Sequence, residues 1–428
     1  MHFVVKQCTS EYALLYTHNG NLSIGYRTIE RMLRTAVESH ADWVYSHRHV
    51  IKQDTMLAVP TNEYQEGSVR DDFDFGPLVL IRTEAVREFL ATNPEEMHHA
   101  ALYQLRLHIS RTGRLVHINE YLYTEHEQDT RTSGEKQFDY VDPRNRQIQA
   151  EMERACTTHL KEAGAFIDYR NLQTIDTEAG HFPYEATVII PVKNRAKTIG
   201  DAVLSVLSQK TDFPFNLIVV DNHSTDGTTE ILSQLSIINC QLSIVTPERT
   251  DLGIGGCWDL AIRHPQCGRY AVQLDSDDIY SDPHTLQRIV DAFHRERCAM
   301  VVGSYRLCNF ALETLPPGII DHREWTEENG MNNALRINGL GAPRACWTPL
   351  LRTINLPNTS YGEDYALGLR ISREYRIGRI YDVLYCCRRW EGNSDAALDV
   401  EKVNANNLYK DRIRTWELEA RIRMNDGQ

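Results

Sequence analysis

The sequence predicts an α/β protein with a mostly parallel sheet covered by helices on both faces. Between residues 183 and 300, short β-branched runs alternate with segments whose apolar residues recur at helical spacing, which is typical of such sheets. Two of the runs lead directly into an aspartate, Asp221 and Asp275. Ligands of parallel sheets bind beyond the carboxyl ends of the strands, so we expect both side chains in one crevice.

The expected elements follow in order along this region. Residues 186–192 form a short run that includes Pro191 and ends at Val192, which is typical of a strand buried on both faces. A helix is expected at 197–209, where apolar residues make one stripe. Further strands are expected at 216–221, 242–245 and 270–274, and further helices at 228–235 and 258–263.

Three carboxylates stand among the four residues that follow the run 270–274. They belong to Asp275, Asp277 and Asp278, with Ser276 between them. Mg²⁺ and Mn²⁺ favour oxygen ligands and are often held by one or two protein carboxylates together with a substrate phosphate. The cluster therefore indicates a cation site that meets a diphosphate, although an acidic turn that caps the next helix would use the same residues.

Four motifs carry a resemblance to the family 2 glycosyltransferases over residues 183–395. They lie, in order, at 188–195, 218–228, 274–278 and 361–364. The family has the GT-A fold, a Rossmann-like mixed sheet, and uses nucleotide-diphosphate sugars. The resemblance therefore implies a metal-dependent, inverting transfer of a sugar to a hydroxyl of a glycan or glycolipid acceptor.

The resemblance also implies roles for individual residues. Asp364 would be the base that takes the acceptor proton, with Glu363 beside it. Asp275 and Asp277 would form the DXD motif, which binds the sugar nucleotide and its Mn²⁺ or Mg²⁺. The expected nucleotide-sugar contacts come from Pro191, Val192, Asn194, Arg195, Asp221, Asp275, Ser276, Arg388 and Arg389. Which of the two arginines faces the diphosphate stays open.

Two other functions stay open. One is a non-catalytic sugar-nucleotide-binding or scaffold protein, against which the intact Asp275, Asp277 and Asp364 argue. The other is a sugar nucleotidyltransferase, which would need a glycine-rich phosphate loop after its first strand, whereas residues 193–195 are Lys-Asn-Arg. A dinucleotide loop at 253–256 is disfavoured, because the third glycine of that motif is missing.

Residues 1 to about 130 resemble a degenerate copy of the carboxyl-terminal half of the same domain. A shift of 230 residues (252 − 22) lays 21–25 on 251–255, and in this register Tyr45, His47 and Arg48 replace the three carboxylates. A shift of 262 (380 − 118) lays 118–123 on 380–385. Interpolation lays His99 and Ala100 on the Glu363-Asp364 pair. We therefore expect this segment to be inert as an enzyme and to bind acceptor, mediate association or support the active domain.

The predicted organisation has four parts. They are a degenerate partial GT-A-like domain at 1–140, a linking helix and linker at 141–182, the GT-A domain at 183–397, and a C-terminal helix at 398–428. The apolar face of that last helix is expected to pack on the core; it consists of Val403, Tyr409, Ile413, Trp416 and Ile422.

The totals exclude several protein classes. A net charge of −13 in 428 residues argues against a non-specific nucleic-acid or anionic-membrane binder. No apolar stretch approaches the roughly 20 residues that span a bilayer, and the first residues lack a signal-peptide core, so we expect a cytoplasmic protein. The ten cysteines show no CxxC pair and are expected to be reduced thiols. Assembly into homo-oligomers is compatible with the sequence.

Overall fold

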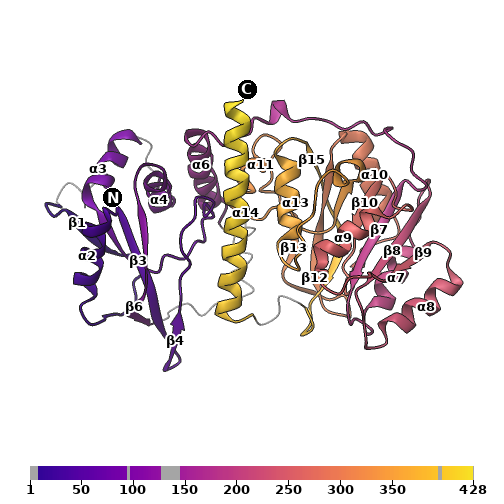
Figure 1. Ribbon diagram of the computed structural model, residues 1–428, viewed down its shortest axis with the longest axis horizontal. Coiled ribbons are helices and arrows are strands. Elements are labelled where there is room, and N and C mark those ends of the chain that lie inside the picture. The colour runs from indigo at the N-terminus through magenta and orange to yellow at the C-terminus, as the bar shows by residue number, and fades with distance from the viewer. Residues whose placement is uncertain (1–7, 94–96, 127–144, 394–397, 428) are drawn as a thin grey trace. The chain divides into compact units, whose positions relative to one another are not determined.

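The computed structural model describes residues 8–93, 97–126, 145–393 and 398–427, which divide into two compact units (Figure 1). Unit 1 contains the residues up to Phe166, the short segment Leu335–Ile337, and the residues from Ala397 onward. Unit 2 contains Ile167–Ala334 and Asn338–Ala396. The helix expected to link the domains, α6 (Arg146–Glu162), and the C-terminal helix α14 (Val400–Asp426) both belong to unit 1.

Unit 2 is built on a nine-stranded mixed sheet. The strand order is β11-β15-β12-β14-β10-β7-β8-β9, with β13 beside β12. Strands β10, β7, β8 and β9 run parallel, whereas β14 is antiparallel to both of its neighbours. The strands are β7 (Ala186–Val192), β8 (Phe215–Asp221), β9 (Leu242–Val245), β10 (Tyr270–Gln273), β11 (Ile279–Tyr280), β12 (Met300–Cys308), β13 (Thr314–Ile320), β14 (Arg344–Trp347) and β15 (Ile377–Arg388). The predicted α/β class with a mixed sheet is confirmed.

The central strands are buried because helices flank the sheet. Every residue of β8 and of β10 is buried, as expected for near-continuous apolar runs. The helices are α7 (Ile199–Leu207), α8 (Thr228–Ile238), α9 (Ile254–Arg263), α10 (Thr285–Glu296), α11 (Gly330–Asn333), α12 (Thr348–Leu351) and α13 (Glu363–Ser372). Helix α9 begins four residues before the expected start at 258, because Gly255 and Gly256 continue the helix there.

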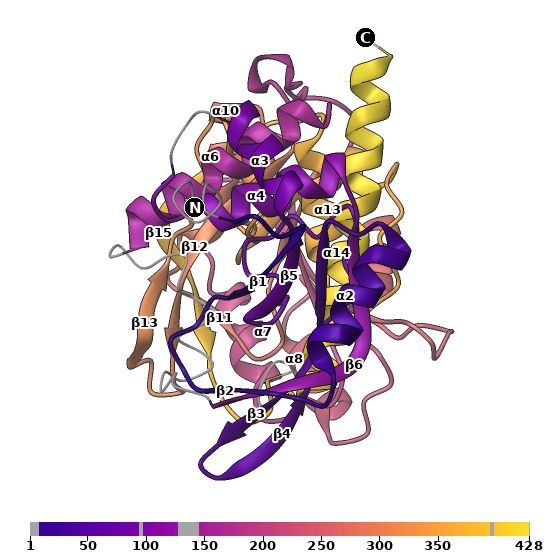
Figure 2. The ribbon, with the colours of Figure 1, turned by 90° about the vertical axis from the view of Figure 1, so that its left-hand side faces the viewer.

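Unit 1 has a six-stranded sheet of order β1-β5-β3-β6-β2, with β4 beside β3 (Figure 2). Its strands are β1 (Tyr12–Tyr16), β2 (Leu22–Ile24), β3 (Trp43–Lys52), β4 (Thr55–Val59), β5 (Leu78–Arg82) and β6 (Leu115–His126). Its helices, besides α6 and α14, are α2 (Thr28–Ser39), α3 (Thr83–Thr92) and α4 (Ala101–Thr112).

The strand pairing of unit 1 repeats that of part of unit 2. Strand β3 is antiparallel to β4 and β5 and parallel to β6, as β12 is to β13, β14 and β15. Trp43 pairs with Leu115 as Met300 pairs with Ile377, which corresponds to shifts of 257 (300 − 43) and 262 (377 − 115). In the same way β1 pairs antiparallel with β5 as β10 does with β14.

This pairing corrects one part of the sequence alignment. The shift of 262 for the last strand is confirmed, but the shift of 230 is wrong, because Ser46 lies on β3, which takes the place of β12. From β1 and β10 the shift is 258 (270 − 12), so residues 17–20 take the place of the acidic turn 275–278. They are Thr-His-Asn-Gly and contain no carboxylate.

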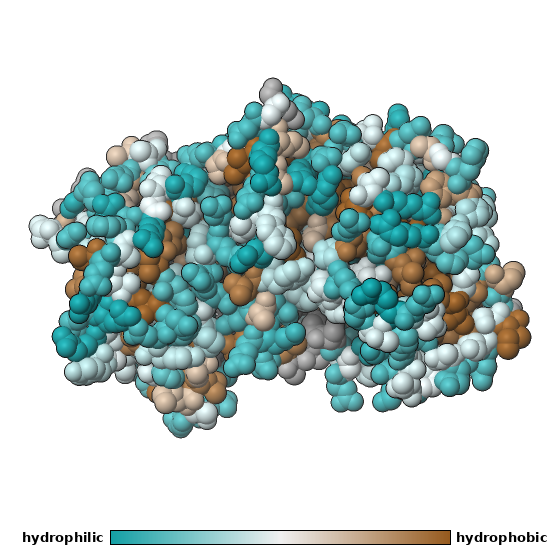
Figure 3. All heavy atoms as spheres, in the orientation of Figure 1, coloured by the Kyte–Doolittle hydropathy of each residue, from teal (hydrophilic) through white to brown (hydrophobic). Residues whose placement is uncertain are grey.

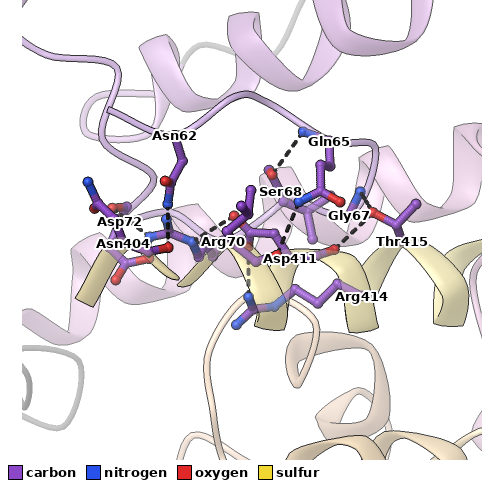
Figure 4. A network of polar contacts seen from close by, with 12 residues as sticks. Asn62, Gln65, Gly67, Ser68, Arg70, Asp72, Asn404, Asp411, Arg414 and Thr415 are labelled. Carbon is purple, nitrogen blue, oxygen red and sulfur yellow. Dashed lines mark hydrogen bonds and ion pairs between the residues drawn. The ribbon is translucent and has the colours of Figure 1, made fainter. Parts of the chain in front are cut away.

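Charged residues share the buried side of α14 with part of the expected apolar face. Ile413 is 6% exposed and Asp411 is fully buried, whereas Val403 and Trp416 are 39% and 55% exposed. Asp411 accepts hydrogen bonds from Arg70 Nε (3.1 Å) and Arg414 Nη1 (2.9 Å), as Figure 4 shows. The helix is therefore fixed to the segment around residue 70 by buried ion pairs.

In the part of the chain that the structure describes, none of the helices is both long enough and apolar enough to cross a membrane. Hydrophilic residues cover most of the face shown in Figure 3, and hydrophobic residues form separate groups on it.

Candidate active site

Three parallel strands bring the predicted donor residues to one edge of the unit 2 sheet. Strands β10, β7 and β8 are direct neighbours, and Val192 pairs with Asp221 at the ends of the last two. Pro191 is half-buried and Val192 is buried, and both end their strand at this edge. The turn with Asp275 follows β10 at the same edge.

The loops that follow β7 and β8 are bound to each other. Asn194 has a positive φ of 55°, donates its N–H to Ser224 Oγ (2.9 Å) and accepts Thr225 N–H through Oδ1 (2.8 Å). Arg195 N–H donates to Thr228 Oγ1 at 2.8 Å. The two loops therefore form one rigid wall beside the strand ends.

Asp221 is buried and its carboxylate shapes the second of these loops. Its Oδ1 accepts from Ser224 N–H (3.1 Å), and its Oδ2 accepts from Thr229 Oγ1 (2.5 Å). Both oxygens are thus hydrogen-bonded within the protein, which makes Asp221 a residue that holds the loop as well as one that borders the crevice.

The acidic turn after β10 is fixed from several directions. Tyr385 OH accepts the backbone N–H of Asp275 (3.0 Å), and Gln273 Nε2 donates to Asp275 Oδ1 (2.9 Å). The buried Ser276 accepts a hydrogen bond from Thr198 Oγ1 through its carbonyl (2.9 Å). Hydrogen bonds from the protein therefore hold both the backbone of the turn and the carboxylate of Asp275.

Asp277 is covered by the loop that follows β15. Its Oδ2 accepts from Trp390 Nε1 (3.2 Å) and from Asn393 Nδ2 (3.1 Å). Arg195 Nε lies 3.9 Å from the same oxygen, and Arg195 Nη2 donates to the carbonyl of Gly392 (3.2 Å). The loop 390–393 and the loop after β7 therefore meet at this carboxylate.

The electrostatics of the turn favour a cation. Burial raises the pKa of Asp275, and burial together with the charges of Asp275 and Asp277 raises the pKa of Asp278 well above its usual value. Within the described ranges, His, Cys, Asp and Glu form no ready-made group of three or more for a metal. Two carboxylates with a substrate phosphate suffice for Mg²⁺ or Mn²⁺, so Asp275 and Asp277 fit such an ion.

The structure distinguishes the two neighbouring arginines. Arg388 is buried, its N–H donates to Asp278 Oδ1 (2.7 Å), and its guanidinium donates to the carbonyl of Asp277 (2.6 Å) and to Asp201 Oδ2 (2.7 Å). This side chain holds the acidic turn from behind. Arg389 is half-buried, and its backbone N–H donates to the carbonyl of Cys308 (2.8 Å).

Glu363 and Asp364 are the first two residues of α13, after Gly362 with a positive φ of 78°. Asp364 Oδ1 accepts a hydrogen bond from the backbone N–H of Tyr365 (2.7 Å), and the side chain of Asp364 is 31% exposed. Burial, with a contribution from the charge of Asp364, raises the pKa of Glu363 to about 7. The two carboxylates therefore differ: one is partly open to solvent, and the other is mostly enclosed.

Arg344, which was not predicted, connects this pair to the acidic turn. Its Nη2 lies 3.0 Å from Asp364 Oδ2, and its Nη1 donates to the carbonyl of Leu340 (2.7 Å). Its backbone N–H donates to Gln273 Oε1 (3.3 Å), and Gln273 in turn donates to Asp275. A continuous chain of polar contacts thus runs from Asp364 to Asp275. The one signal in the sequence was a glutamine at the end of an apolar strand.

Gly255 explains why the run 253–256 is rich in glycine. A Cβ at this position would lie 2.0 Å from the carbonyl oxygen of Pro357, so only glycine lets α9 approach the loop 357–360. Gly255 N–H also donates to the carbonyl of Thr359 (2.9 Å). This loop leads into α13, so the glycine helps to position Glu363 and Asp364.

Comparison with known proteins agrees with this geometry. The family model described as "Glycosyl transferase family 2" matches residues 187–347. The glycosyltransferase TuaG of Bacillus subtilis (strain 168), whose assigned name places it in teichuronic acid biosynthesis, is 34% identical over 121 residues, 28% of this chain and 46% of TuaG. The O-antigen chain rhamnosyltransferase RfbN of Salmonella typhimurium is 31% identical over 117 residues, 27% of this chain and 36% of RfbN. The matched stretch thus spans less than half of either relative.

Solved structures were compared as well. The crystal structure of S. aureus TarS 1-349 in complex with UDP-GlcNAc has a TM-score of 0.42 and 22% identity, over 55% of this chain and 72% of that chain. The mannosyltransferase PcManGT from Pyrobaculum calidifontis, in complex with GDP-Man and Mn²⁺, has a TM-score of 0.39 and 16% identity, over 69% of this chain and 85% of that chain. The match to the family model identifies residues 187–347 as a glycosyl transferase family 2 domain.

Proposed function

We propose that this chain is a metal-dependent, inverting glycosyltransferase that moves a sugar from a nucleotide-diphosphate sugar to a hydroxyl of a glycan or glycolipid acceptor. The observation that carries the proposal is the chain of contacts from Asp364 through Arg344 and Gln273 to Asp275, because it joins an acceptor base to a donor site. The names of the relatives, which refer to teichuronic acid biosynthesis and to an O-antigen chain, support a glycan acceptor.

The nucleoside would lie against the ends of β7 and β8, beside Pro191, Val192 and Asp221. The bound loops 193–198 and 222–227 support this position, since a rigid wall orients a planar base at little entropic cost. Asn194 and Arg195 stand at the rim of this wall.

Asp275 and Asp277 would hold Mn²⁺ or Mg²⁺, which when bound stabilises the charge that develops on the departing nucleoside diphosphate. Arg195 is the arginine best placed to add positive charge, because it lies beside Asp277, whereas the guanidinium of Arg388 already bonds within the protein. Arg389 is the second candidate for the diphosphate. Ser276 contributes the backbone between the two ligands.

Asp364 would accept the proton of the acceptor hydroxyl as that oxygen attacks the anomeric carbon. A single displacement of the nucleoside diphosphate inverts the configuration at this carbon. Arg344 is a positioning residue, because it fixes one oxygen of the base and leaves the carboxylate partly open to solvent. Glu363 supports the start of α13 next to it. General-base assistance of this kind contributes roughly 10² to 10⁴-fold to the rate.

The test compares Asp364→Asn with the exposed control Glu230→Gln. Donors are first identified by calorimetry with UDP, GDP and dTDP sugars, with and without Mn²⁺, and transfer is then measured with the donor that binds. We expect Asp364→Asn to lose most of the transfer and to keep the donor affinity, and the control to keep both. Retained turnover in Asp364→Asn would refute the assigned base.

The same measurements separate the other functions. Donor binding without transfer to any acceptor would favour a scaffold protein. Release of pyrophosphate from a nucleoside triphosphate and a sugar phosphate would favour a nucleotidyltransferase. Donor binding that is equally strong without Mn²⁺ would refute the role given to Asp275 and Asp277.

A further inference from the structure

Among the described residues, strand β1 is the last strand at one side of the unit 1 sheet. Among the described residues its one neighbour is β5, and the five paired residues run without a register shift. Its sequence, Tyr-Ala-Leu-Leu-Tyr, has no charge, no proline and no glycine. Natural proteins usually protect an edge strand with charges, proline or a bulge, since its free N–H and C=O groups otherwise pair with another chain. The edge is therefore suited to accept a further strand.

Unit 2 shows what covers the equivalent edge in a more complete sheet. Strand β10, which corresponds to β1, pairs with β14 on one side and with β7 on the other. No described strand of unit 1 takes the place of β7. Within the described part of unit 1, the half-repeat has thus kept the strand but shows no partner on the side that β7 occupies in unit 2.

An apolar stripe lies exposed on helix α2, which packs on strands β3, β5 and β6 of the same sheet. Ile29, Leu33 and Val37 recur every four residues along α2 and are 43%, 36% and 54% exposed. At the shift of 257, Ile29 and Leu33 correspond to Leu286 and Val290 of α10, which are 0% and 2% exposed. These two positions of the stripe are therefore buried in unit 2 and open in unit 1, whereas Val37 corresponds to His294, which is exposed.

The strand and the helix stripe contribute to one surface. Tyr12 and Tyr16 pack against the cluster under α2 that includes Met32 and Ala36. Since side chains alternate along a strand, Leu14 points to the same face, and it is 39% exposed. We name Leu14, Ile29, Leu33 and Val37 the β1–α2 surface.

The charges around this surface are balanced. Three ion pairs flank the helix stripe, Arg27–Glu30, Arg31–Glu120 and Arg34–Glu38. The whole chain, by contrast, carries a net charge of −13, which would repel a second copy at most other places. A second copy would meet no net charge of its own sign here.

We propose that the β1–α2 surface is a dimer interface between two copies of this chain, in which β1 pairs antiparallel with β1 of the partner about a two-fold axis. The strand is nearly a palindrome: with Leu14 on the axis, Tyr12 lies opposite the partner's Tyr16, and Ala13 lies opposite the partner's Leu15. The same patch thus serves both chains, as a closed two-fold interface requires. The two helix stripes then exclude water beside the joined sheets.

The first test is the oligomeric state of the full chain by sedimentation equilibrium. We expect a dimer that Leu14→Lys and, separately, Leu33→Glu convert to a monomer, with a dissociation constant at least tenfold higher. Met56→Lys on β4 is the matched control, because Met56 is also an exposed apolar strand residue, 62% exposed, and it should leave the dimer intact. Equal melting temperatures by circular dichroism show that the variants fold.

The second test reads the register. In a background with Cys8→Ser and Cys240→Ser, Leu14→Cys places two thiols at the axis, where the Cα atoms of an antiparallel pair lie about 4.5 to 5.5 Å apart, within disulfide range. Mild oxidation should cross-link this variant and leave Met56→Cys uncross-linked. A monomeric full chain, or a dimer that both Leu14→Lys and Leu33→Glu leave intact, would overturn the proposal. These outcomes do not depend on glycosyl transfer.

Discussion

Replacement of Arg344 by methionine should slow sugar transfer without weakening donor binding. Methionine keeps much of the length of the side chain and removes its charge, so Asp364 Oδ2 loses the partner 3.0 Å away. Two unit charges at this distance attract by about 5 kcal/mol at an effective dielectric constant of about 20. Desolvation and the partial exposure of Asp364 offset about half of this, which leaves about 2–3 kcal/mol. We therefore expect kcat to fall about 10²-fold.

Donor binding should respond in the opposite direction. Arg344 lowers the pKa of Asp275 by its charge, so its removal raises this pKa, but it also takes away a positive charge that repels a divalent cation. We expect the affinity for the nucleoside diphosphate with Mn²⁺, measured by calorimetry, to stay equal or to rise. Arg344→Lys keeps the charge and should recover part of kcat.

A merely structural role of Arg344 would give another pattern. In that case kcat, the affinity for the nucleotide and the melting temperature would all fall together in Arg344→Met. An unchanged kcat would equally refute the reasoning, because it would mean that the ion pair does not orient Asp364.

Three further outcomes are expected. The pKa of Glu363 rises from 4.5 to about 7 on folding, so the folded state binds more protons and the stability of the wild type falls as the pH rises through this window. In denaturant titrations, the unfolding free energy of Glu363→Gln relative to the wild type should therefore be up to about 3 kcal/mol higher at pH 8 than at pH 4. A difference between the two proteins that does not change with pH would contradict this. Gly255→Ala should lower kcat at least tenfold, because its Cβ would lie 2.0 Å from the Pro357 carbonyl oxygen, whereas Gly200→Ala, with open space around it, should leave the rate unchanged. Asp411→Ala should cost about 3 kcal/mol, because it removes the buried carboxylate that accepts from both Arg70 and Arg414, although Arg70 keeps its ion pair with Asp72. We expect a lower melting temperature that the exposed control Glu401→Ala does not show.

The strands of unit 2 could be predicted because their cause is local. β7, β8 and β10 are short apolar runs that end at polar residues, and burial on both faces demands this pattern. The acidic turn was visible for the same reason. The sequence pattern does not show which way a side chain points. It could not predict that Arg388, rather than Arg389, faces inward, because this depends on a contact with Asp201, which is 187 residues away in sequence.

Arg344 and Gln273 escaped prediction for a related reason. Neither belongs to a motif, and their contacts arise only when β14 inserts antiparallel next to β10. The first part of the repeat was misaligned because it rested on a short match between residues 21–25 and 251–255. The pairing of strands identifies corresponding residues of the two units more reliably. In α14, only part of the expected apolar face is packed: Ile413 is buried and Trp416 is exposed, and the buried side also carries Asp411, which pairs with Arg70.

The contacts of Arg388 determine when, during synthesis of the chain, the acidic turn becomes anchored. This residue ends β15, yet it bonds to Asp277 and Asp278, which precede it by 111 and 110 residues, and to Asp201 on the first helix after β7. While the chain is still on the ribosome, the acidic turn lacks this anchor until the last strand has emerged. We expect nascent chains that stop before residue 388 to expose the carboxylates of Asp277 and Asp278 to solvent and to bind no nucleotide sugar, so that binding begins only after β15 has emerged.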